Sequence, residues 1–269
     1  MKEERRKNYK SKTFRFNMLN KRGQVAIFVI MAMVIVAVIL AVFLYPRAGP
    51  GATTEFTPTS YLKSCIEPEI RKNLEVLGRN GGYLNPEGAL EYQGEKIKYL
   101  CYTSEFYKTC VVQQPLLKEH IENELTGLLK SRAGTCLDTL KQELEKRNYQ
   151  VSIGQGESKV SIIPGSIEIS YSNPITLTKE SSQRFDGFKT EINSQMYDLI
   201  LTAISILDYE TTFGDSETTL YLRYYPDLRM EKIKLSDGSK VYLLTNVVTN
   251  ESLRFASRSL SWPPGYGLE

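Results

Sequence analysis

The sequence predicts an α+β protein in which an N-terminal transmembrane helix precedes an extracellular domain of about three helices with antiparallel β-hairpins or a β-meander. The first observation is a run of 21 residues without a charged side chain, from Val25 to Tyr45. Such a run is long enough to cross a hydrocarbon core of about 30 Å at about 1.5 Å per helical residue. The second observation is that apolar residues in the rest of the chain recur at helical spacing in some segments and at strand spacing in others. The third is that all four cysteines follow the apolar run, which indicates a domain in an oxidising compartment.

These observations divide the chain into five expected segments. They are a basic cytoplasmic tail (1–22), the transmembrane helix (23–46), a linker rich in Gly and Pro (47–58), the extracellular α+β domain (59–258) and a flexible C-terminal tail (259–269).

Positive charge is concentrated in the tail. Residues 1–22 hold nine Lys or Arg against two Glu, a net charge of +7. The chain has 34 basic and 31 acidic residues, so residues 47–269 hold 25 and 29 and carry a net charge of −4. Basic flanks of membrane helices stay in the cytoplasm, which predicts the N-terminus inside the cell and residues 47–269 outside. A net-acidic domain also argues against nucleic acid as a partner and leaves the lipid bilayer as the expected one.

Two other interpretations of the apolar run fit it less well. The apolar core of a cleaved secretory signal spans about 7–15 residues and ends at a small-residue site. This run is longer and ends in Phe43-Leu44-Tyr45-Pro46. A helix buried in a globular core would carry a polar stripe, which the run lacks.

The start of the apolar run has the features of a processing site. Lys21-Arg22-Gly23-Gln24 leads directly into the helix and resembles the class III signal sequences of archaeal type IV pilin-like proteins. The resemblance implies that a membrane peptidase cuts between Gly23 and Gln24, leaving 269 − 23 = 246 residues. Phe28 occupies the fifth position of the mature chain, where many pilins carry Glu. We therefore favour a membrane anchor over a filament subunit as the role of this helix.

The remainder resembles a group of functionally uncharacterised archaeal single-pass surface proteins. The residues that carry this resemblance are Cys65, Leu77-Gly78, Gly81-Gly82-Tyr83 and Cys136-Leu137. It implies an envelope protein and no particular reaction.

Helical spacing predicts three amphipathic helices, over about residues 59–79, 115–148 and 182–209. Gly127 and Gly134 allow a kink or break in the second. The apolar residues on which the three assignments rest are Leu62, Ile66, Ile70, Leu74 and Leu77; Leu117, Ile121, Leu125, Leu128, Cys136, Leu140 and Leu144; and Phe185, Phe188, Ile192, Met196, Leu199, Ala203 and Ile206.

Alternating apolar and polar residues predict the strands. We expect one hairpin around Gln93-Gly94 and another around Asp237-Gly238. Between them we expect a three- or four-stranded meander over residues 149–178, with turns at Gly154-Gln155-Gly156 and Pro164-Gly165. A helical or extended piece is expected at 217–225 and a last strand at 251–257.

The four cysteines favour two disulfides, for which three connectivities exist. We favour Cys101–Cys110, which closes a tight local loop, and Cys65–Cys136, which joins the first soluble helix to the second. Zinc binding would call for a Cys-x-x-Cys pair or several histidines, and the chain has neither. Free buried thiols are the other alternative.

The sequence contains no recognisable catalytic motif. His120 is the only histidine, and no Gly-x-Ser-x-Gly elbow supplies a nucleophile for it. Gly154-x-Gly156 lacks the third glycine of a dinucleotide-binding loop. We therefore expect no catalytic residue, no metal ligand and no cofactor. We assign His120 and a set of four carboxylates to solvated helix faces; the carboxylates are Glu122, Glu124, Glu143 and Glu145.

Two surface features remain. Asn250-Glu251-Ser252 is a sequon for N-glycosylation, which makes Asn250 a candidate modification site, although such tripeptides also occur by chance. Tyr221, Tyr224 and Tyr225 fit sheet packing better than exposed binding of a sugar or a partner.

The expected function is that of a non-enzymatic, membrane-anchored cell-surface protein of the archaeal envelope, structural or partner-binding. A pilin-like filament subunit, cleaved between Gly23 and Gln24 and self-associating through the apolar helix, is the second expectation. The third is an extracellular hydrolase with paired carboxylates.

Overall fold

The computed structural model describes residues 21–44 and 57–261, with side chains of the first segment described for residues 28–40. The chain divides into two compact units, Met1–Glu55 and Phe56–Glu269. The predicted basic tail, apart from its last two residues, and nearly all of the predicted linker lie outside the described residues.

The described residues of the first unit form helix α1 (Lys21–Leu44). Every described side chain of this helix, from Phe28 to Leu40, is exposed. Within the described residues, no helix is found that is both long enough and apolar enough to cross a membrane. The transmembrane assignment of residues 23–46 therefore remains a prediction.

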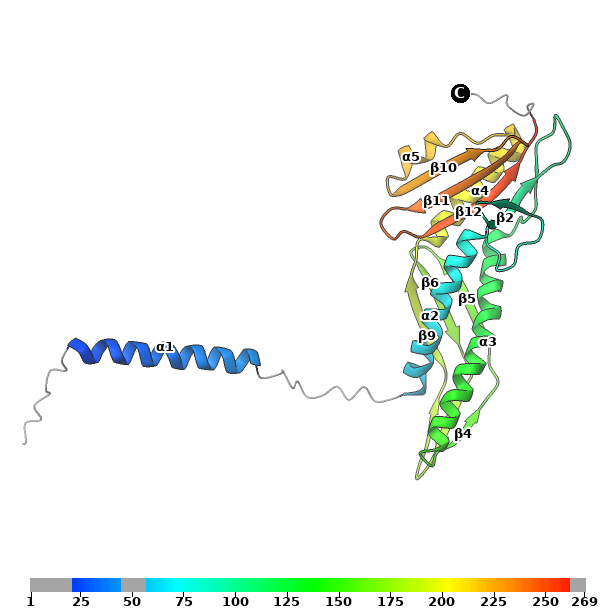
Figure 1. Cartoon of the computed structure of the whole chain (residues 1–269). Helices are drawn as coiled ribbons and strands as arrows, with labels where there is room; N and C mark the ends of the chain where they lie inside the picture. Colours follow the sequence, from blue (N-terminus) through cyan, green and yellow to red (C-terminus); the bar gives the residue numbers. More distant parts are fainter. Residues whose placement is uncertain (1–20, 45–56, 262–269) are drawn as a thin grey trace, which may run out of the picture. The chain divides into compact units, whose positions relative to one another are not determined.

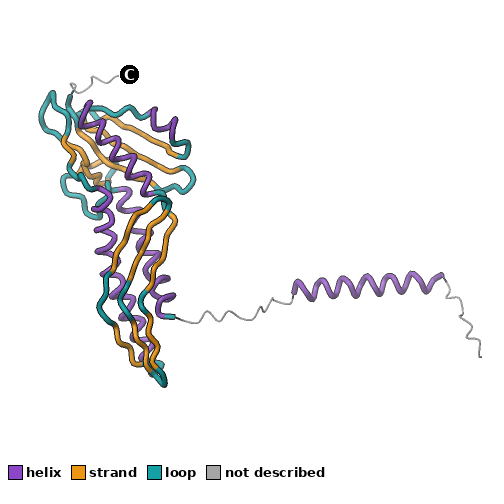
Figure 2. The backbone as a smooth tube through the Cα atoms, turned by 180° about the vertical axis from the view of Figure 1, so that it is seen from behind, coloured by secondary structure: helices purple, strands orange, loops and turns teal. Residues whose placement is uncertain are grey.

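The second unit combines helices with three sheets, which confirms the α+β class (Figures 1 and 2). We call its two parts the arm and the head. The arm contains α2 (Pro58–Arg79), α3 (Leu117–Glu145), β4 (Gln150–Ile153), β5 (Ser158–Ile163), β6 (Ser166–Tyr171), β7 (Ile175–Thr178), β8 (Ser182–Phe185) and β9 (Phe188–Asn193). The head contains β1 (Ala89–Tyr92), β2 (Glu95–Tyr102), β3 (Val111–Val112), α4 (Met196–Phe213), α5 (Thr219–Tyr224), β10 (Leu228–Lys234), β11 (Ser239–Asn246) and β12 (Ser252–Arg258).

Helices α2 and α3 lie side by side and cover one face of the arm's strands (Figure 1). Thr57 caps α2 by accepting a hydrogen bond from the Ser60 amide at 3.2 Å, and Pro58 suits the first turn. All five apolar residues predicted for α2 are buried. Helix α3 runs unbroken through Gly127 and Gly134, and the buried residue of its fourth turn is Leu129 rather than Leu128.

The strands of the arm form a three-stranded antiparallel ribbon that is interrupted near its middle. β5, β6 and β9 make the half nearer the head, and β4, β7 and β8 make the far half. The predicted turn at Gly154–Gly156 is wrong, because β4 pairs with β7 and not with β5. The two glycines instead mark the interruption. A Cβ on Gly156 would lie 2.5 Å from the Ser172 carbonyl oxygen, so only glycine lets the two chains pass this closely.

The prediction of a helix from residue 182 is also wrong, since residues 182–193 form β8 and β9 and α4 begins only at Met196. Phe185, Phe188 and Ile192 match helical spacing, but Thr190 and Ile192 are the residues of β9 that point into the core. Because this segment pairs with β6, its backbone is extended, and every second side chain points to the same face.

The head is a mixed sheet in the order β1-β2-β12-β11-β10, with β3 attached to β2. The hairpins predicted at Gln93-Gly94 and Asp237-Gly238 are confirmed, as is the strand after Asn250. β2 and β12 pair in parallel, although we expected antiparallel pairs. Helix α4 packs on one face of this sheet, against β12, β11 and β2 (Figure 2).

The predicted boundary of the C-terminal tail at residue 259 is wrong. Ser259 and Leu260 are buried, and the Leu260 amide donates to the Lys108 carbonyl at 3.0 Å. The folded domain therefore extends at least to Ser261, and residues 262–269 lie outside the described residues.

Candidate functional site

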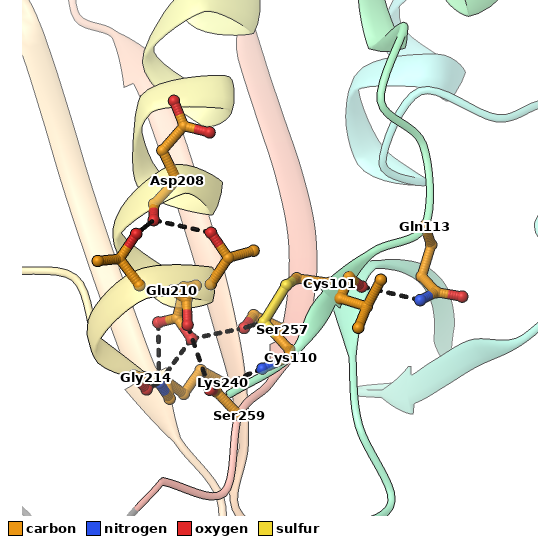
Figure 3. The surroundings of a disulfide bond; sticks show 12 residues. Cys101, Cys110, Gln113, Asp208, Glu210, Gly214, Lys240, Ser257 and Ser259 are labelled. Carbon is orange, nitrogen blue, oxygen red and sulfur yellow. Dashed lines mark hydrogen bonds and ion pairs between the residues drawn. A yellow bond between two sulfur atoms is a disulfide. The ribbon is translucent and has the colours of Figure 1, made fainter. Parts of the chain in front are cut away.

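A buried carboxylate, Glu210, is the most unusual chemical feature of the head. It lies on the sheet-facing side of α4, three and four residues after Leu207 and Ile206, and has no exposed surface. The ammonium group of Lys240, on β11, donates to both carboxylate oxygens at 2.8 Å. The Ser257 hydroxyl donates to Glu210 at 2.7 Å, and the Tyr242 hydroxyl also donates to it. Figure 3 shows Glu210 of α4 with Lys240 of β11 and Ser257 of β12.

Asp215, which follows the C-cap of α4, extends the network toward the surface. Its carboxylate pairs with Lys240 at 3.3 Å, with Lys232 at 3.1 Å and with Lys234 at 2.9 Å. Partial burial raises the pKa of this carboxyl, but the three ammonium groups outweigh burial and lower its pKa to about 2. Burial and the Glu210 charge raise the pKa of Tyr242, which keeps that hydroxyl protonated as a donor.

The disulfide Cys101–Cys110 borders the same network (Figure 3). The Cys110 sulfur lies 3.8 Å from the Ser257 hydroxyl, and the Cys110 amide donates to the Ser259 hydroxyl at 3.1 Å. Ser259 in turn donates to the Glu210 carbonyl at 3.3 Å. The short loop closed by this disulfide is therefore joined to α4 through β12.

The network has the features of a structural element rather than of a catalytic site. Its carboxylate already accepts hydrogen bonds from three side chains and is sealed from solvent, so no substrate reaches it. A buried charge that is paired and fully hydrogen-bonded holds its elements in one arrangement. We had not predicted this cluster. The available signal was a Glu on the buried face of α4 together with Lys240 and Tyr242 on the inward face of β11.

The second disulfide joins Cys65 of α2 to Cys136 of α3, with Cα atoms 6.3 Å apart. Both disulfides have the pairing that we favoured, and neither zinc ligation nor free thiols are needed to account for the cysteines. Within the described residues, no group of three or more His, Cys, Asp or Glu side chains is arranged to hold a metal ion.

His120 is less exposed than we expected. Its ring lies against that of Tyr83, tilted by 37° with centroids 3.9 Å apart, and burial is the main cause that lowers the pKa of His120. It borders a shallow surface cavity of about 440 Å³ on α3. Its Nε2 lies 3.9 Å from the Glu124 carboxylate, one turn further along α3, and this contact within one helix brings no nucleophile to the ring.

One of the four carboxylates assigned to solvent has a structural role instead. Glu122 accepts a hydrogen bond from the Ile162 amide at 2.7 Å and pairs with Lys118, while Thr126 accepts from the Val160 amide at 3.0 Å. Strand β5 is an edge strand, so α3 side chains satisfy amides that would otherwise be free to pair with another chain.

The expectation that the tyrosines pack on a sheet is wrong for two of the three. Tyr224 is 75% exposed and Tyr225 is 53% exposed. Both border a small cavity of about 160 Å³ next to Asp198 and Asp227. Tyr221 is half-buried and exchanges a hydrogen bond with Ser205 of α4 at 2.8 Å.

Asn250 lies in the exposed loop between β11 and β12 with φ of 58°. It borders a cavity of about 510 Å³ that Arg71 and Arg79 of α2 also line. Its side chain is thus accessible to a modifying enzyme. Gly23 and Gln24 lie in the first turns of α1, where the backbone is described and the side chains are not.

Comparison with known proteins identifies no relative: no protein-family model, curated protein or solved structure matches the chain. The fold and the buried network define the second unit as a disulfide-bonded α+β domain.

Proposed function

We propose that the protein is a non-enzymatic, membrane-anchored protein of the archaeal cell surface, with a structural or partner-binding role. The observation that carries the proposal is the distribution of cysteine and charge about the apolar segment. Two disulfides lie within residues 57–261, and disulfides persist outside the reducing cytosol. The basic residues that favour a cytoplasmic location precede the apolar segment.

Three further observations support an anchor. The stretch from Val25 to Tyr45 has no charged residue, and its backbone is helical as far as Leu44. All described side chains of α1, residues 28–40, are apolar. A helix that is apolar all round buries itself in lipid or against other membrane helices.

Protease protection tests the proposal. Intact cells that express the full chain are treated with an external protease, and the fragments are identified by mass spectrometry. We expect cleavage within residues 45–56 to release the domain, with the N-terminal tail protected until the cells are lysed. A domain that is protected in intact cells and digested after lysis would contradict the proposal.

A pilin-like filament subunit is the second candidate, and Lys21-Arg22-Gly23-Gln24 is the observation that favours it. Sequencing the N-terminus of the native protein distinguishes the two. A terminus at Gln24 supports a processed subunit, and electron microscopy of the same preparation then tests for filaments. A terminus at Met1 or Lys2 leaves the simple anchor.

A further inference from the structure

The sequon Asn250-Glu251-Ser252 borders a cavity between the head and helix α2 of the arm. Asn250 lies in the exposed loop between β11 and β12, and Ser252 is the first residue of β12. A Cβ on Gly78 of α2 would lie 2.2 Å from the Ser252 carbonyl oxygen, so the start of β12 passes directly over α2. A group attached to Asn250 therefore begins at the edge of the cavity that this loop and α2 both line.

The two asparagines of this loop differ in how the fold uses them. The Asn246 side-chain oxygen accepts hydrogen bonds from the Val248 and Thr249 amides, both at 3.0 Å. The Asn250 side chain is exposed and forms no hydrogen bond with any described residue, and neither does the Ser252 hydroxyl. These are the two groups that define a sequon, the amide that is modified and the hydroxyl two residues later. Both are left free by the fold.

The cavity has the chemistry to hold a short saccharide. Its α2 wall carries Arg71, Glu75 and Arg79, which follow one another at steps of four and so lie on one face of the helix. The buried side chains of Leu74 and Met196 add an apolar floor. Sugar rings have hydroxyls that both donate and accept and C–H faces that pack on apolar groups. Guanidinium groups donate and carboxylates accept, and hydrogen bonds to such charged groups are the strong ones.

The size of the cavity agrees with such an occupant. Its volume is about 510 Å³. Sites for small ligands have volumes of roughly 300–1,000 Å³.

We propose that Asn250 carries an N-linked saccharide whose first sugars lie in this cavity against α2. The donor is a saccharide linked through C1 to a polyprenyl phosphate or diphosphate. The C1–O bond to the carrier breaks, a bond from C1 to the Asn250 Nδ2 forms, Nδ2 gives up one proton, and the carrier leaves as its free phosphate or diphosphate. The inference rests on the proposed surface location, because N-glycosylation marks surface loops of exported domains.

Mass spectrometry tests the modification. The full chain is purified from membranes of an archaeal host that N-glycosylates its surface proteins, and it is digested with trypsin. The peptide of residues 241–254 contains the sequon, and we expect it to carry the added mass of a saccharide on Asn250. Asn250→Asp and Ser252→Ala should abolish this mass. Ser252→Thr keeps the sequon and should retain it.

Thermal unfolding of the same preparations tests the contact with the cavity. We expect the Tm of Asn250→Asp to lie about 2–4 °C below that of the glycosylated wild type, because a few hydrogen bonds are lost. In a background that combines Arg71→Ala and Glu75→Ala, this difference should fall to about half or less. Lys72→Ala is the matched control background, since Lys72 is an exposed residue of α2 outside the cavity lining, and it should leave the difference unchanged.

A second control separates the saccharide from the substitution. Wild type and Asn250→Asp exported to the periplasm of a bacterium without N-glycosylation should have equal Tm values, since neither carries the saccharide. A difference there as large as in the archaeal preparations would overturn the contact, as would an undiminished difference in the Arg71→Ala and Glu75→Ala background.

An unmodified Asn250 in the archaeal preparation would overturn the inference as a whole. The protease-protection experiment then shows what else has failed. A domain that is digested in intact cells keeps the proposed surface location and removes only the saccharide, whereas a protected domain contradicts both.

Discussion

At the scale of single residues, the ion pair between Glu210 and Lys240 dominates the head. Attraction between two charges strengthens as the local dielectric constant falls, and removal of the charges from water costs free energy at the same time. The hydroxyls of Tyr242 and Ser257 offset part of that cost by donating to the carboxylate. The pair therefore gives little net stability while intact and becomes costly when one partner is removed.

Glu210→Gln should accordingly destabilise the domain strongly. The substitution leaves the Lys240 ammonium buried beside a neutral amide, and we expect the free energy of unfolding to fall by about 3–5 kcal/mol. Chemical denaturation followed by circular dichroism measures the change. Glu143→Gln is the matched control, because Glu143 pairs with Lys146 at 2.8 Å on the exposed surface of α3. Its loss should lower the free energy of unfolding far less than the loss of Glu210, because water screens the exposed pair. Equal losses of unfolding free energy for the two variants would show that the buried pair matters no more to stability than the surface pair.

Asp215 should make stability depend on acid pH. Its folded-state pKa of about 2 lies below the ordinary value of 3.8, because Lys240, Lys234 and Lys232 outweigh the opposing effect of burial. The carboxylate therefore stabilises the folded state above pH 3.8, and this contribution is lost as the pH falls toward 2. We expect wild type to lose about 1–2 kcal/mol across that window relative to Asp215→Asn, after allowance for solvent screening. Parallel pH profiles of unfolding for the two proteins would contradict the assignment.

At the scale of elements, the spacing of apolar residues predicted correctly those segments in which it fits a helix and not a strand, or the reverse. Helix α2 carries apolar residues at steps of four, four, four and three, and all five are buried. Residues 182–193 carry apolar residues at both helical and strand positions, so local spacing does not decide between the two. Pairing with β6 and β7 decides it, and such non-local pairing leaves no signal in a short window.

The same limit applies to the glycines. Gly127 was expected to permit a break in α3, but the helix is continuous there and a Cβ would have no atom within 4 Å. Gly187 was given no role, yet it has φ of 93° and a Cβ there would lie 2.0 Å from the Tyr171 carbonyl oxygen. Whether a glycine is required depends on the chain that passes it, which the sequence does not reveal.

Alanine at these two positions should have opposite effects on stability. Gly127→Ala removes backbone freedom from the unfolded chain at an open helical position, so we expect a gain of about 0.5–1 kcal/mol. Gly187→Ala forces a side chain into positive φ and against the neighbouring strand, so we expect a loss of about 2–3 kcal/mol. Thermal unfolding of the two variants beside wild type measures both. A loss for Gly127→Ala would mean that the helix needs flexibility at this point.

At the scale of the whole molecule, the class of the fold and both cysteine pairs could be predicted, while the buried site could not. Cys101–Cys110 was favoured because it closes a short loop, and Cys65–Cys136 because it joins the first two helices of the domain. The Glu210 network needs α4, β11 and β12 to meet, and these elements are separated by up to 47 residues along the chain. The parallel pairing of β2 with β12 joins even more distant segments and sets the order of the head sheet.

The direction of the chain across a membrane should control its disulfides. In the proposed orientation both disulfides form outside the cell. When membranes are isolated without reductant, the protein in them should therefore have no cysteine thiol that can be alkylated. A reversed variant replaces the seven basic residues of segment 2–15 by glutamine and changes Ala52, Thr53 and Thr54 to lysine. The positive-inside rule then favours a cytoplasmic domain, where the cell keeps cysteines reduced.

We expect all four cysteines of the reversed variant to be alkylated, as counted by the mass of the protein. The control carries the three added lysines on an intact tail. It should remain fully oxidised, because nine basic residues still precede the apolar segment and Arg47 with the three lysines follows it. Full oxidation of both variants would show that tail charge does not set the orientation. Four free thiols in the wild type would place the domain inside the cell and exclude the proposed surface location.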